Sequence, residues 1–361
     1  MKILILTNLD MGLYKFRKEL IEELLLRKHE VILALPQGDY IEPLTKLGCS
    51  VIEAPVDRRG INPFKDFMLY LKYRKIMKQV DPDLVITYTI KPNIYGGMAA
   101  RSAGKNYAVN VTGLGTAFEK PGILRSLVIA LYRYALKEVK AVFVENSGIK
   151  DALGRYGLCN IDKVIVLNGA GVNTDRFPYQ EYPHNDRMHF LFIGRIMKEK
   201  GIEEVLSAMK RLIDEGMSCI LDVVGPYEEK KYEEIFGQCE SEGWLKYHGY
   251  QDDVTPYIAA CDCFVLPSYH EGMANTNLEC ASSGRPVITS AIPGCWESVI
   301  EGETGFLCEP QNVDSVYEAM RKMLCCTESE RTDMGRKGRQ HMQEVFEKKL
   351  IVARTLQGLF Q

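Results

Sequence analysis

Short apolar runs alternate with longer amphipathic segments along this chain, and the alternation passes through two complete series. Uninterrupted apolar runs are typical of strands in a parallel sheet, because helices cover both faces of such a sheet. The runs predict strands at residues 2–7, 30–35, 50–53, 83–88, 107–112, 141–145 and 163–167, and then at 189–193, 219–224, 245–248, 264–266, 287–289 and 305–308. Each series therefore predicts an α/β domain with a doubly wound parallel sheet.

The two series are separated by residues 168–173, which are rich in glycine and asparagine and typical of a linker. A chain of 361 residues is also long enough for two domains, each with its own core. We therefore predict an N-terminal Rossmann-like domain at residues 1–173 and a C-terminal one at residues 174–346, facing each other across a cleft. Ligands bind open α/β sheets beyond the carboxyl ends of the strands, so we expect functional residues there.

Composition narrows the class of protein. The chain is 46% hydrophobic and 26% charged, as is usual for globular proteins. No apolar run reaches the ~18 residues of a membrane-spanning helix, and the run at residues 2–7 is too short for a signal peptide. The 11 cysteines form no C-x-x-C pair, which favours free thiols in a reducing cytoplasm and predicts no zinc site. No G-x-G-x-x-G follows the first strand, which disfavours a nicotinamide-dependent dehydrogenase.

Charge is distributed unevenly. Residues 1–175 hold 25 Lys and Arg against 18 Asp and Glu, net +7, whereas residues 176–361 hold 20 against 30, net −10. A basic half favours an anionic partner such as a phosphate or a membrane surface, although chance also produces such differences.

One basic amphipathic segment could lie on anionic lipid at the inner face of the cell membrane, or form a solvated helix face. It comprises Arg58, Arg59, Phe64, Lys65, Phe67, Met68, Leu71, Lys72, Arg74, Lys75, Ile76 and Lys78. The more apolar residues 127–136 are typical of a core helix.

Two carboxylates mark the strand–loop–helix segment at residues 264–289. The strand breaks at Pro267, Glu271 lies on the loop, and a helix that begins near Asn275 carries Glu279. The free backbone amides at the start of such a helix suit a phosphate group. The alternative is that Glu279 is a solvated helix residue and Glu271 an ordinary loop charge.

Two cations follow the strand at residues 189–193. Arg195 and Lys200 bracket a loop in the string Gly194-Arg195-Ile196-Met197-Lys198-Glu199-Lys200-Gly201. At a strand end, fixed cations could neutralise a diphosphate leaving group, because arginine can bind two phosphate oxygens and lysine acts as a point charge. The alternative is a pair of solvated loop cations.

Together, the strings G-R-x4-K-G and E-x7-E resemble the signature of the retaining glycosyltransferases of family 4, which have the GT-B fold. The resemblance covers nearly the whole chain, is strongest from Gly194 to Pro310, and points to the capsular and lipid-linked oligosaccharide branch. It implies two Rossmann-like domains, with the C-terminal helix at residues 347–361 packing back on the first domain.

The resemblance also implies roles for single residues. Arg195 and Lys200 would bind the donor diphosphate, and Glu279 would accept hydrogen bonds from the ribose. Glu271 would lie near the transferred sugar and complete the expected catalytic set of Arg195, Lys200 and Glu271. Backbone amides at the helix start would hold phosphate or sugar oxygens. The remaining donor-binding positions that it implies are Gly12, Gly194, Val224, Gly225, Gly249, Tyr250, Pro267, Ser268, Gly272, Met273, Ala274 and Asn275.

In the first half, Tyr14, Arg17 and Lys91 resemble the acceptor-binding positions of the same branch. Arg17 and Lys91 would bind the pyrophosphate of the acceptor, and surface cations at helix starts are the alternative. Gly12 stands where the family often has two glycines in a loop. Residues 112–116 lack the histidine that many relatives carry there, so no histidine role is expected.

These implications predict a hexosyltransferase that needs no metal or other cofactor. It would move a sugar with retention from a nucleotide-diphosphate sugar, expected to be a UDP-sugar, to an undecaprenyl-diphosphate-linked saccharide in bacterial capsule, O-antigen or exopolysaccharide synthesis. No carboxylate can be assigned as a covalent nucleophile, so departure of the diphosphate through an ion pair is expected. Two alternatives stay open: a UDP-sugar epimerase of similar two-domain shape, and a noncatalytic nucleotide-sugar or lipid-binding module. No nucleic-acid partner is expected.

Overall fold

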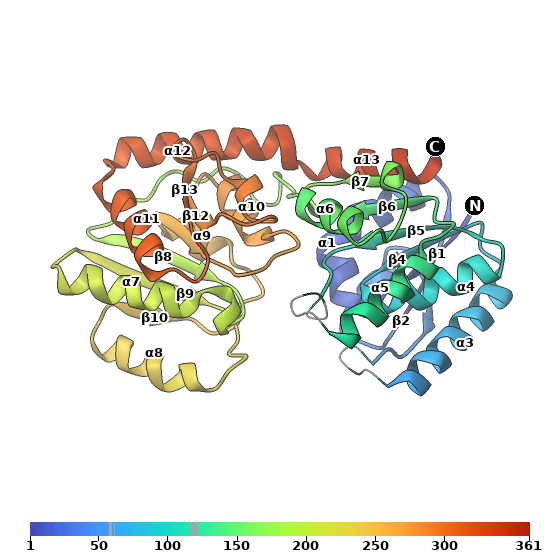
Figure 1. Ribbon diagram of the computed structural model, residues 1–361. Coiled ribbons are helices and arrows are strands. Elements are labelled where there is room, and N and C mark those ends of the chain that lie inside the picture. Colours follow the sequence, from blue (N-terminus) through green and yellow to red (C-terminus); the bar gives the residue numbers. More distant parts are fainter. Residues whose placement is uncertain (58–59, 61, 116–117, 119–121) are drawn as a thin grey trace. The chain divides into compact units, whose positions relative to one another are not determined.

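A computed structural model describes residues 1–57, 60, 62–115, 118 and 122–361 (Figure 1). Contacts divide the chain into two units. The first unit comprises Met1–Ala170 together with Lys349–Gln361, and the second comprises Gly171–Lys348. The division falls three residues before the position expected from the linker composition.

The first unit is built on a seven-stranded parallel sheet in the order β3-β2-β1-β4-β5-β6-β7. Its strands are β1 Lys2–Leu6, β2 Glu30–Leu35, β3 Ser50–Glu53, β4 Leu84–Tyr88, β5 Asn106–Val111, β6 Ala141–Val144 and β7 Val164–Val166. The order changes direction at β1, so the carboxyl ends of β1 and β4 lie side by side, in the register Leu6 to Thr87. A functional site is expected at such a switch point.

Helices cover both faces of this sheet because successive side chains of a strand point to opposite sides. Ile3 and Ile5 belong to a core shared with α1 and α13, whereas Leu4 and Leu6 belong to a core shared with α3. The helices are α1 Asp10–Leu26, α2 Ile41–Lys46, α3 Pro63–Val80, α4 Gly97–Ser102, α5 Ile123–Ala135, α6 Ser147–Arg155 and α13 Lys348–Phe360, with a π-helix at Pro92–Gly96. The C-terminal helix is thus a part of the first unit.

The second unit has a six-stranded parallel sheet in the order β10-β9-β8-β11-β12-β13. Its strands are β8 Met188–Ile193, β9 Cys219–Val224, β10 Leu245–Tyr247, β11 Cys263–Leu266, β12 Val287–Ser290 and β13 Gly305–Cys308. Its helices are α7 Ile202–Asp214, α8 Lys231–Ser241, α9 Thr255–Ala260, α10 Asn275–Ser282, α11 Val313–Cys325 and α12 Glu328–His341, followed by a π-helix at Met342–Phe346. All strands predicted from the sequence are present, with ends within one residue of the prediction, and the doubly wound fold class is confirmed.

The prediction that Gly12 lies in a loop after the first strand is wrong. Helix α1 begins at Asp10, so Gly12 lies in its first turn instead of in a loop. The buried carboxylate of Asp10 accepts a hydrogen bond from the backbone amide of Tyr40 at 2.8 Å, and an acidic residue is favourable at a helix N-terminus. These two effects favour a helix that already includes Gly12, where the glycine itself had predicted a loop.

Candidate functional site

Three glycines bring the carboxyl ends of β8, β9 and β10 together in the second unit. The amide of Gly194 donates to the carbonyl of Val224 at 3.0 Å, and the amide of Gly225 donates to the carbonyl of Gly249 at 2.8 Å. Gly225 has a φ of +143°, and a Cβ there would overlap the carbonyl oxygen of Gly194. Only glycine therefore permits this approach. The expected donor-binding residues Val224, Gly225 and Gly249 thus lie at one sheet edge.

The loop after β8 carries Lys200 toward the loop after β11. Lys200 ends a short 3₁₀ helix, Lys198–Lys200, and Gly201 follows with a φ of +75°. A Cβ on Gly201 would overlap the carbonyl oxygen of Pro267 and lie 2.7 Å from its ring. The two loops can touch because residue 201 is glycine.

Lys200 forms an ion pair with Glu271, and this is the central contact of the candidate site. Their side chains are 20% and 12% exposed, so the pair is shielded without being sealed from solvent. The fully buried Ser268 donates its hydroxyl to the same carboxylate oxygen of Glu271 at 2.8 Å. The structure therefore brings together three residues that the sequence had placed on two separate strand ends.

The start of α10 differs from the expectation of open amides. The helix begins at Asn275, as expected. However, the amide of Ala274 donates to the carbonyl of Gly294 at 2.8 Å, and the amide of Asn275 donates to the carbonyl of Met273 at 3.0 Å. In this conformation Gly294 satisfies the amide of Ala274, and Met273 satisfies that of Asn275. Their expected role toward a phosphate stays a prediction. Glu279 lies about one turn further along α10 and is partly buried.

Arg195 and Tyr250 lie at the exposed rim of this edge. The guanidinium of Arg195 is half exposed and lies 3.6 Å from a carboxylate oxygen of Glu228. An exposed pair at this distance contributes little to stability, so the arginine can exchange partners easily. The hydroxyl of Tyr250 donates to Asp252 at 2.9 Å.

Two supporting residues were missed by the sequence reasoning. Gly294 has a φ of +88°, and a Cβ there would lie 2.7 Å from the carbonyl oxygens of Glu271 and Gly272. The dipeptide Pro293-Gly294 is a turn signal that could have identified it. Asn277 is fully buried and donates to the hydroxyls of Thr289 and Ser298, both at 3.0 Å, which fixes α10 on β12. Nothing in its local sequence distinguishes it from a surface asparagine.

The expected acceptor cations of the first unit are both paired with carboxylates. Arg17 on α1 is buried and donates to Glu145 at 2.8 Å, and Lys91 donates to Asp66 at 2.7 Å. The ring of Tyr14 packs 5.1 Å from that of Tyr40. Glu145 follows β6 and lies 128 residues from Arg17, so no local pattern could have predicted the pairing.

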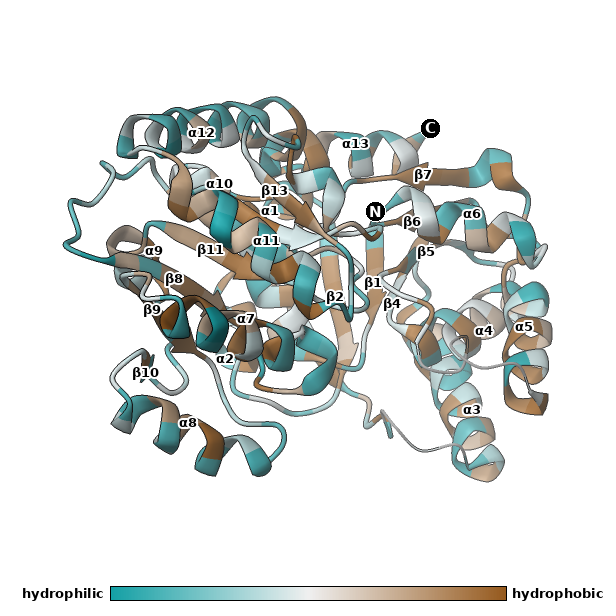
Figure 2. Cartoon of the chain, turned by 60° about the vertical axis from the view of Figure 1, so that its left-hand side comes forward, coloured by the Kyte–Doolittle hydropathy of each residue, from teal (hydrophilic) through white to brown (hydrophobic). Residues whose placement is uncertain are grey.

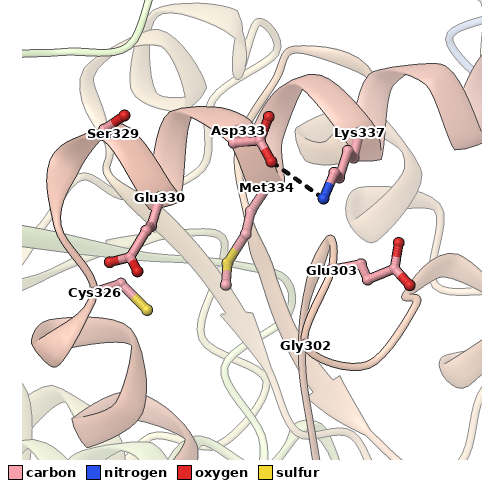
Figure 3. A pocket seen from close by; sticks show the side chains of 8 residues that line it. All are labelled: Gly302, Glu303, Cys326, Ser329, Glu330, Asp333, Met334 and Lys337. Carbon is pink, nitrogen blue, oxygen red and sulfur yellow. Dashed lines mark ion pairs between the residues drawn. The ribbon is translucent and has the colours of Figure 1, made fainter.

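The second unit contains a hollow of about 300 Å³ (Figure 3). It is lined by Gly302, Glu303, Cys326, Ser329, Glu330, Asp333, Met334 and Lys337. Two of its charges already have partners in the chain: Glu330 caps α12 through Thr327, and Asp333 pairs with Lys337 at 3.1 Å. None of the expected donor or acceptor residues lines it. Among the described residues, no group of His, Cys, Asp or Glu side chains is arranged to hold a metal ion.

Comparisons with known proteins find glycosyltransferases for both units. Residues 175–341 match the family described as "Glycosyl transferases group 1", and residues 2–146 match "Glycosyl transferase 4-like". A relative from Campylobacter jejuni is N,N'-diacetylbacillosaminyl-diphospho-undecaprenol alpha-1,3-N-acetylgalactosaminyltransferase, which is 26% identical over 90% of this chain and 89% of its own. UDP-Gal:alpha-D-GlcNAc-diphosphoundecaprenol alpha-1,3-galactosyltransferase from Escherichia coli is 27% identical over 79% of this chain and 76% of its own. A glycosyltransferase structure from Rickettsia africae has a TM-score of 0.81 at 18% identity and covers 99% of this chain and 97% of that one.

Proposed function

We propose that this chain, which belongs to the glycosyltransferases that these two family models describe, transfers a sugar from a UDP-sugar to a saccharide carried on undecaprenyl diphosphate. The observation that carries the proposal is the shielded pair of Lys200 and Glu271 at the carboxyl edge of the second sheet. The two relatives support the substrate classes, since both names include a diphosphoundecaprenol acceptor and one includes UDP-galactose. Such a reaction belongs to the assembly of a capsule, O-antigen or exopolysaccharide.

Negative charge develops on the diphosphate as its bond to the sugar breaks. In this proposal Lys200 and Arg195 stabilise that charge. Glu271 holds Lys200 in position, and Arg195 can leave its weak surface pair. Glu271 then offers its carboxylate to a hydroxyl of the transferred sugar, and Glu279 offers its own to the ribose. We propose further that the reaction proceeds with retention, as the family resemblance implies, and without a metal, because Lys200 and Arg195 supply the positive charge that a metal would otherwise bring.

The test compares two lysines of one short helix. Lys200→Ala should lower the rate of UDP release with a GlcNAc-diphosphoprenol acceptor by about 100-fold, the cost of removing one fixed charge from a transition state. Lys198→Ala is the matched control, because the side chain of Lys198 is exposed and forms a 3.6 Å surface pair with Glu203. Glu279→Ala should also reduce turnover severely. Wild-type rates in both Lys200→Ala and Glu279→Ala would exclude the assigned donor site.

Two further measurements separate the alternatives. Incubation with a UDP-sugar alone should give slow hydrolysis at most, whereas an epimerase would change the sugar without any acceptor. Addition of a strong chelator should leave the transfer rate unchanged if no metal takes part. A loss of transfer that added Mg²⁺ or Mn²⁺ restores would contradict the metal-independent mechanism.

We also propose that the first unit contacts an anionic membrane through α3 and α5. Phe64 and Ile123 are 73% and 90% exposed. Further exposed apolar side chains on these helices are Phe67, Met68, Leu71, Leu124 and Leu127. Figure 2 shows brown stretches among teal ones along α3 and α5. The expectation of a core helix at residues 127–136 is wrong for its first turn, since Leu127 lies at the surface.

Basic residues accompany this apolar surface, as anionic lipid requires. Arg74 and Lys75 are exposed on α3, and Arg125 lies on α5. Arg58 and Arg59, which were expected to contribute, lie outside the described residues. Within the part of the chain that the structure describes, no helix is long and apolar enough to cross a bilayer.

Vesicle sedimentation tests the membrane contact. Phe64→Ser with Ile123→Ser should abolish binding to phosphatidylglycerol vesicles, and vesicles of phosphatidylcholine alone should bind the wild type weakly. Ile235→Ser is the control, because Ile235 is an exposed apolar residue on α8 of the second unit. Equal sedimentation of the wild type and the double variant would rule out this surface.

A further inference from the structure

Helix α7, which begins two residues after Lys200, buries a carboxylate in its first turn. Glu204 is only 7% exposed. Its Oε1 atom accepts a hydrogen bond from the hydroxyl of Tyr269 at 2.7 Å, whereas its Oε2 atom is buried and has no hydrogen-bond partner among the described residues. Burial of a carboxylate oxygen without a partner costs free energy, so the position of Glu204 needs an explanation.

The position of Glu204 at a helix terminus does not explain its burial. Acidic residues are favourable in the first turn of a helix. The neighbouring Glu203 meets this preference at the surface, where it is partly exposed and pairs with Lys231 at 2.7 Å. Glu204 instead faces the interior and contacts the loop after β11. An apolar pair of the same shape could replace the buried bond to Tyr269 at little cost in stability, so stability does not explain the carboxylate either.

Tyr269 joins the two loops that carry Lys200 and Glu271. Its hydroxyl donates to Glu204, and its backbone amide donates to the carbonyl of Glu199 at 2.9 Å. Burial, together with Glu204, raises the pKa of Tyr269, so the hydroxyl stays protonated and continues to donate. Glu199 directly precedes Lys200, and Tyr269 lies two residues before Glu271. The bonds of Tyr269 therefore fix both of the chain segments that form the ion pair.

We propose that Glu204 and Tyr269 are positioning residues of the transfer reaction, and that their hydrogen bond sets the position of Lys200 relative to Glu271. Both side chains are buried, so they act through the ion pair and not on the substrate. Such precision matters because a misplacement of about 1 Å can lower the rate of an enzyme about 100-fold. The proposal rests on the proposed function in taking Lys200 to stabilise the leaving diphosphate.

The test compares two hydrogen bonds that tyrosines donate to glutamates at opposite ends of α7. Tyr269→Phe removes the bond to Glu204. Tyr317→Phe is the matched control, because the buried Tyr317 on α11 donates to the carboxylate of Glu215, at the far end of α7, at 2.8 and 2.7 Å. We expect Tyr269→Phe to lower kcat about 30-fold, within the loss that a small misplacement causes. Tyr317→Phe should leave kcat unchanged.

The KM for the UDP-sugar should change less than kcat in Tyr269→Phe. The charge that Lys200 stabilises grows as the bond to the sugar breaks, so a misplaced lysine weakens the transition state more than the bound donor. A change in KM alone, with the kcat of the wild type, would make the pair a donor-binding feature and overturn its positioning role.

Two further variants separate position from stability. Tyr269→Phe alone leaves the carboxylate of Glu204 without its partner and should destabilise the fold. Tyr269→Phe with Glu204→Leu removes the bond and the carboxylate together, so urea denaturation should show little loss of stability, while kcat falls as in Tyr269→Phe. Glu204→Gln keeps an oxygen that accepts from Tyr269 and should retain most of the kcat. Wild-type kcat in the double variant, or an equal loss of kcat in Glu204→Gln, would overturn the proposal.

A crystal structure of the double variant gives a readout that needs no turnover. We expect the ion pair of Lys200 with Glu271 to be broken there and to be present in Tyr317→Phe. If the wild type transfers no sugar from any UDP-sugar, the proposed function fails, and a broken ion pair in the double variant would still support the role of the buried bond. An intact ion pair in the double variant would overturn that role, whether or not the wild type is active.

Discussion

Gly201 shows how a single backbone position determines whether the candidate donor site can form. Its φ of +75° would cost another residue about 1–2 kcal/mol. In addition, a Cβ there would overlap Pro267, and the chain between Lys200 and α7 would have to move. The ion pair of Lys200 with Glu271 depends on this close approach, so the glycine couples backbone geometry to the position of a charge.

Gly201→Ala should therefore destabilise the second unit by about 3 kcal/mol, the sum of backbone strain and overpacking. Gly216→Ala is the matched control, because Gly216 has a φ of +78° and no heavy atom lies within 4 Å of its built Cβ. The free energy of unfolding of the control should fall by only about 1 kcal/mol. Urea denaturation measures both, and equal losses would show that contact with Pro267 does not constrain residue 201.

At the residue scale, the sequence predicts candidate donor residues but not the contacts that they make. Arg195, Lys200, Glu271 and Glu279 lie in strings that a local pattern can detect. The partner of Arg17 could not be predicted, because Glu145 is distant in sequence and meets Arg17 only once the sheet has formed. The partner of the Ala274 amide could not be predicted either, because a separate loop brings the carbonyl of Gly294 to it.

Among the elements, β9 carries a carboxylate that joins three neighbouring strands. Asp222 lies 2.8 Å from the ring nitrogen of His189 on β8 and 2.7 Å from that of His248, which follows β10. Burial alone would raise the pKa of Asp222, but the hydrogen bonds and charges of the two histidines outweigh it and lower the pKa. The ionised carboxylate is therefore favoured in the folded state.

The sign of the pH dependence follows from this lowered pKa. A carboxyl group with a lower pKa in the folded state stabilises the protein above its unfolded pKa, and the contribution is lost as the pH falls through the folded value. The stability of the second unit should thus decline below about pH 4. Asp222→Asn should cost about 1.5 kcal/mol at pH 7 and flatten this decline, whereas the exposed Asp186→Asn should do neither. A decline of equal slope in Asp222→Asn, measured by urea denaturation from pH 3 to 7, would contradict the assignment.

Strands were the elements that the sequence predicted best, because a buried parallel strand is a short apolar run whatever surrounds it. The burial of helix α5 was harder to predict. Its apolar residues predicted a core position, but a helix of this composition is buried only if another element covers it. The exposure of Ile123 and Leu127 is set by which elements pack nearby, and no local pattern contains that information.

At the scale of the whole molecule, the chain ends by returning to the unit in which it began. Helix α13 packs Ile351, Leu356 and Leu359 into the core that contains Ile3 and Ile5 of β1. Gly358 makes the approach close, since a Cβ there would lie 2.5 Å from Ile165 and 2.8 Å from Phe143. The stability of the first unit therefore depends on residues that are synthesised after the second unit is complete.

Leu356→Ala should lower the melting temperature of the first unit while leaving that of the second unchanged. Removing a buried leucine side chain costs about 2–3 kcal/mol, which corresponds to about 6 °C for a unit of this size. Leu350→Ala is the control, because it makes the same change at an exposed position of α13. Differential scanning calorimetry measures both transitions. At the proposed donor site, UDP would bind only the folded form of the second unit and should therefore raise the transition temperature of that unit. This shift identifies which transition belongs to which unit. A shift of both transitions in Leu356→Ala would mean that the two units unfold together, and a shift of neither would mean that α13 does not hold the first unit's core.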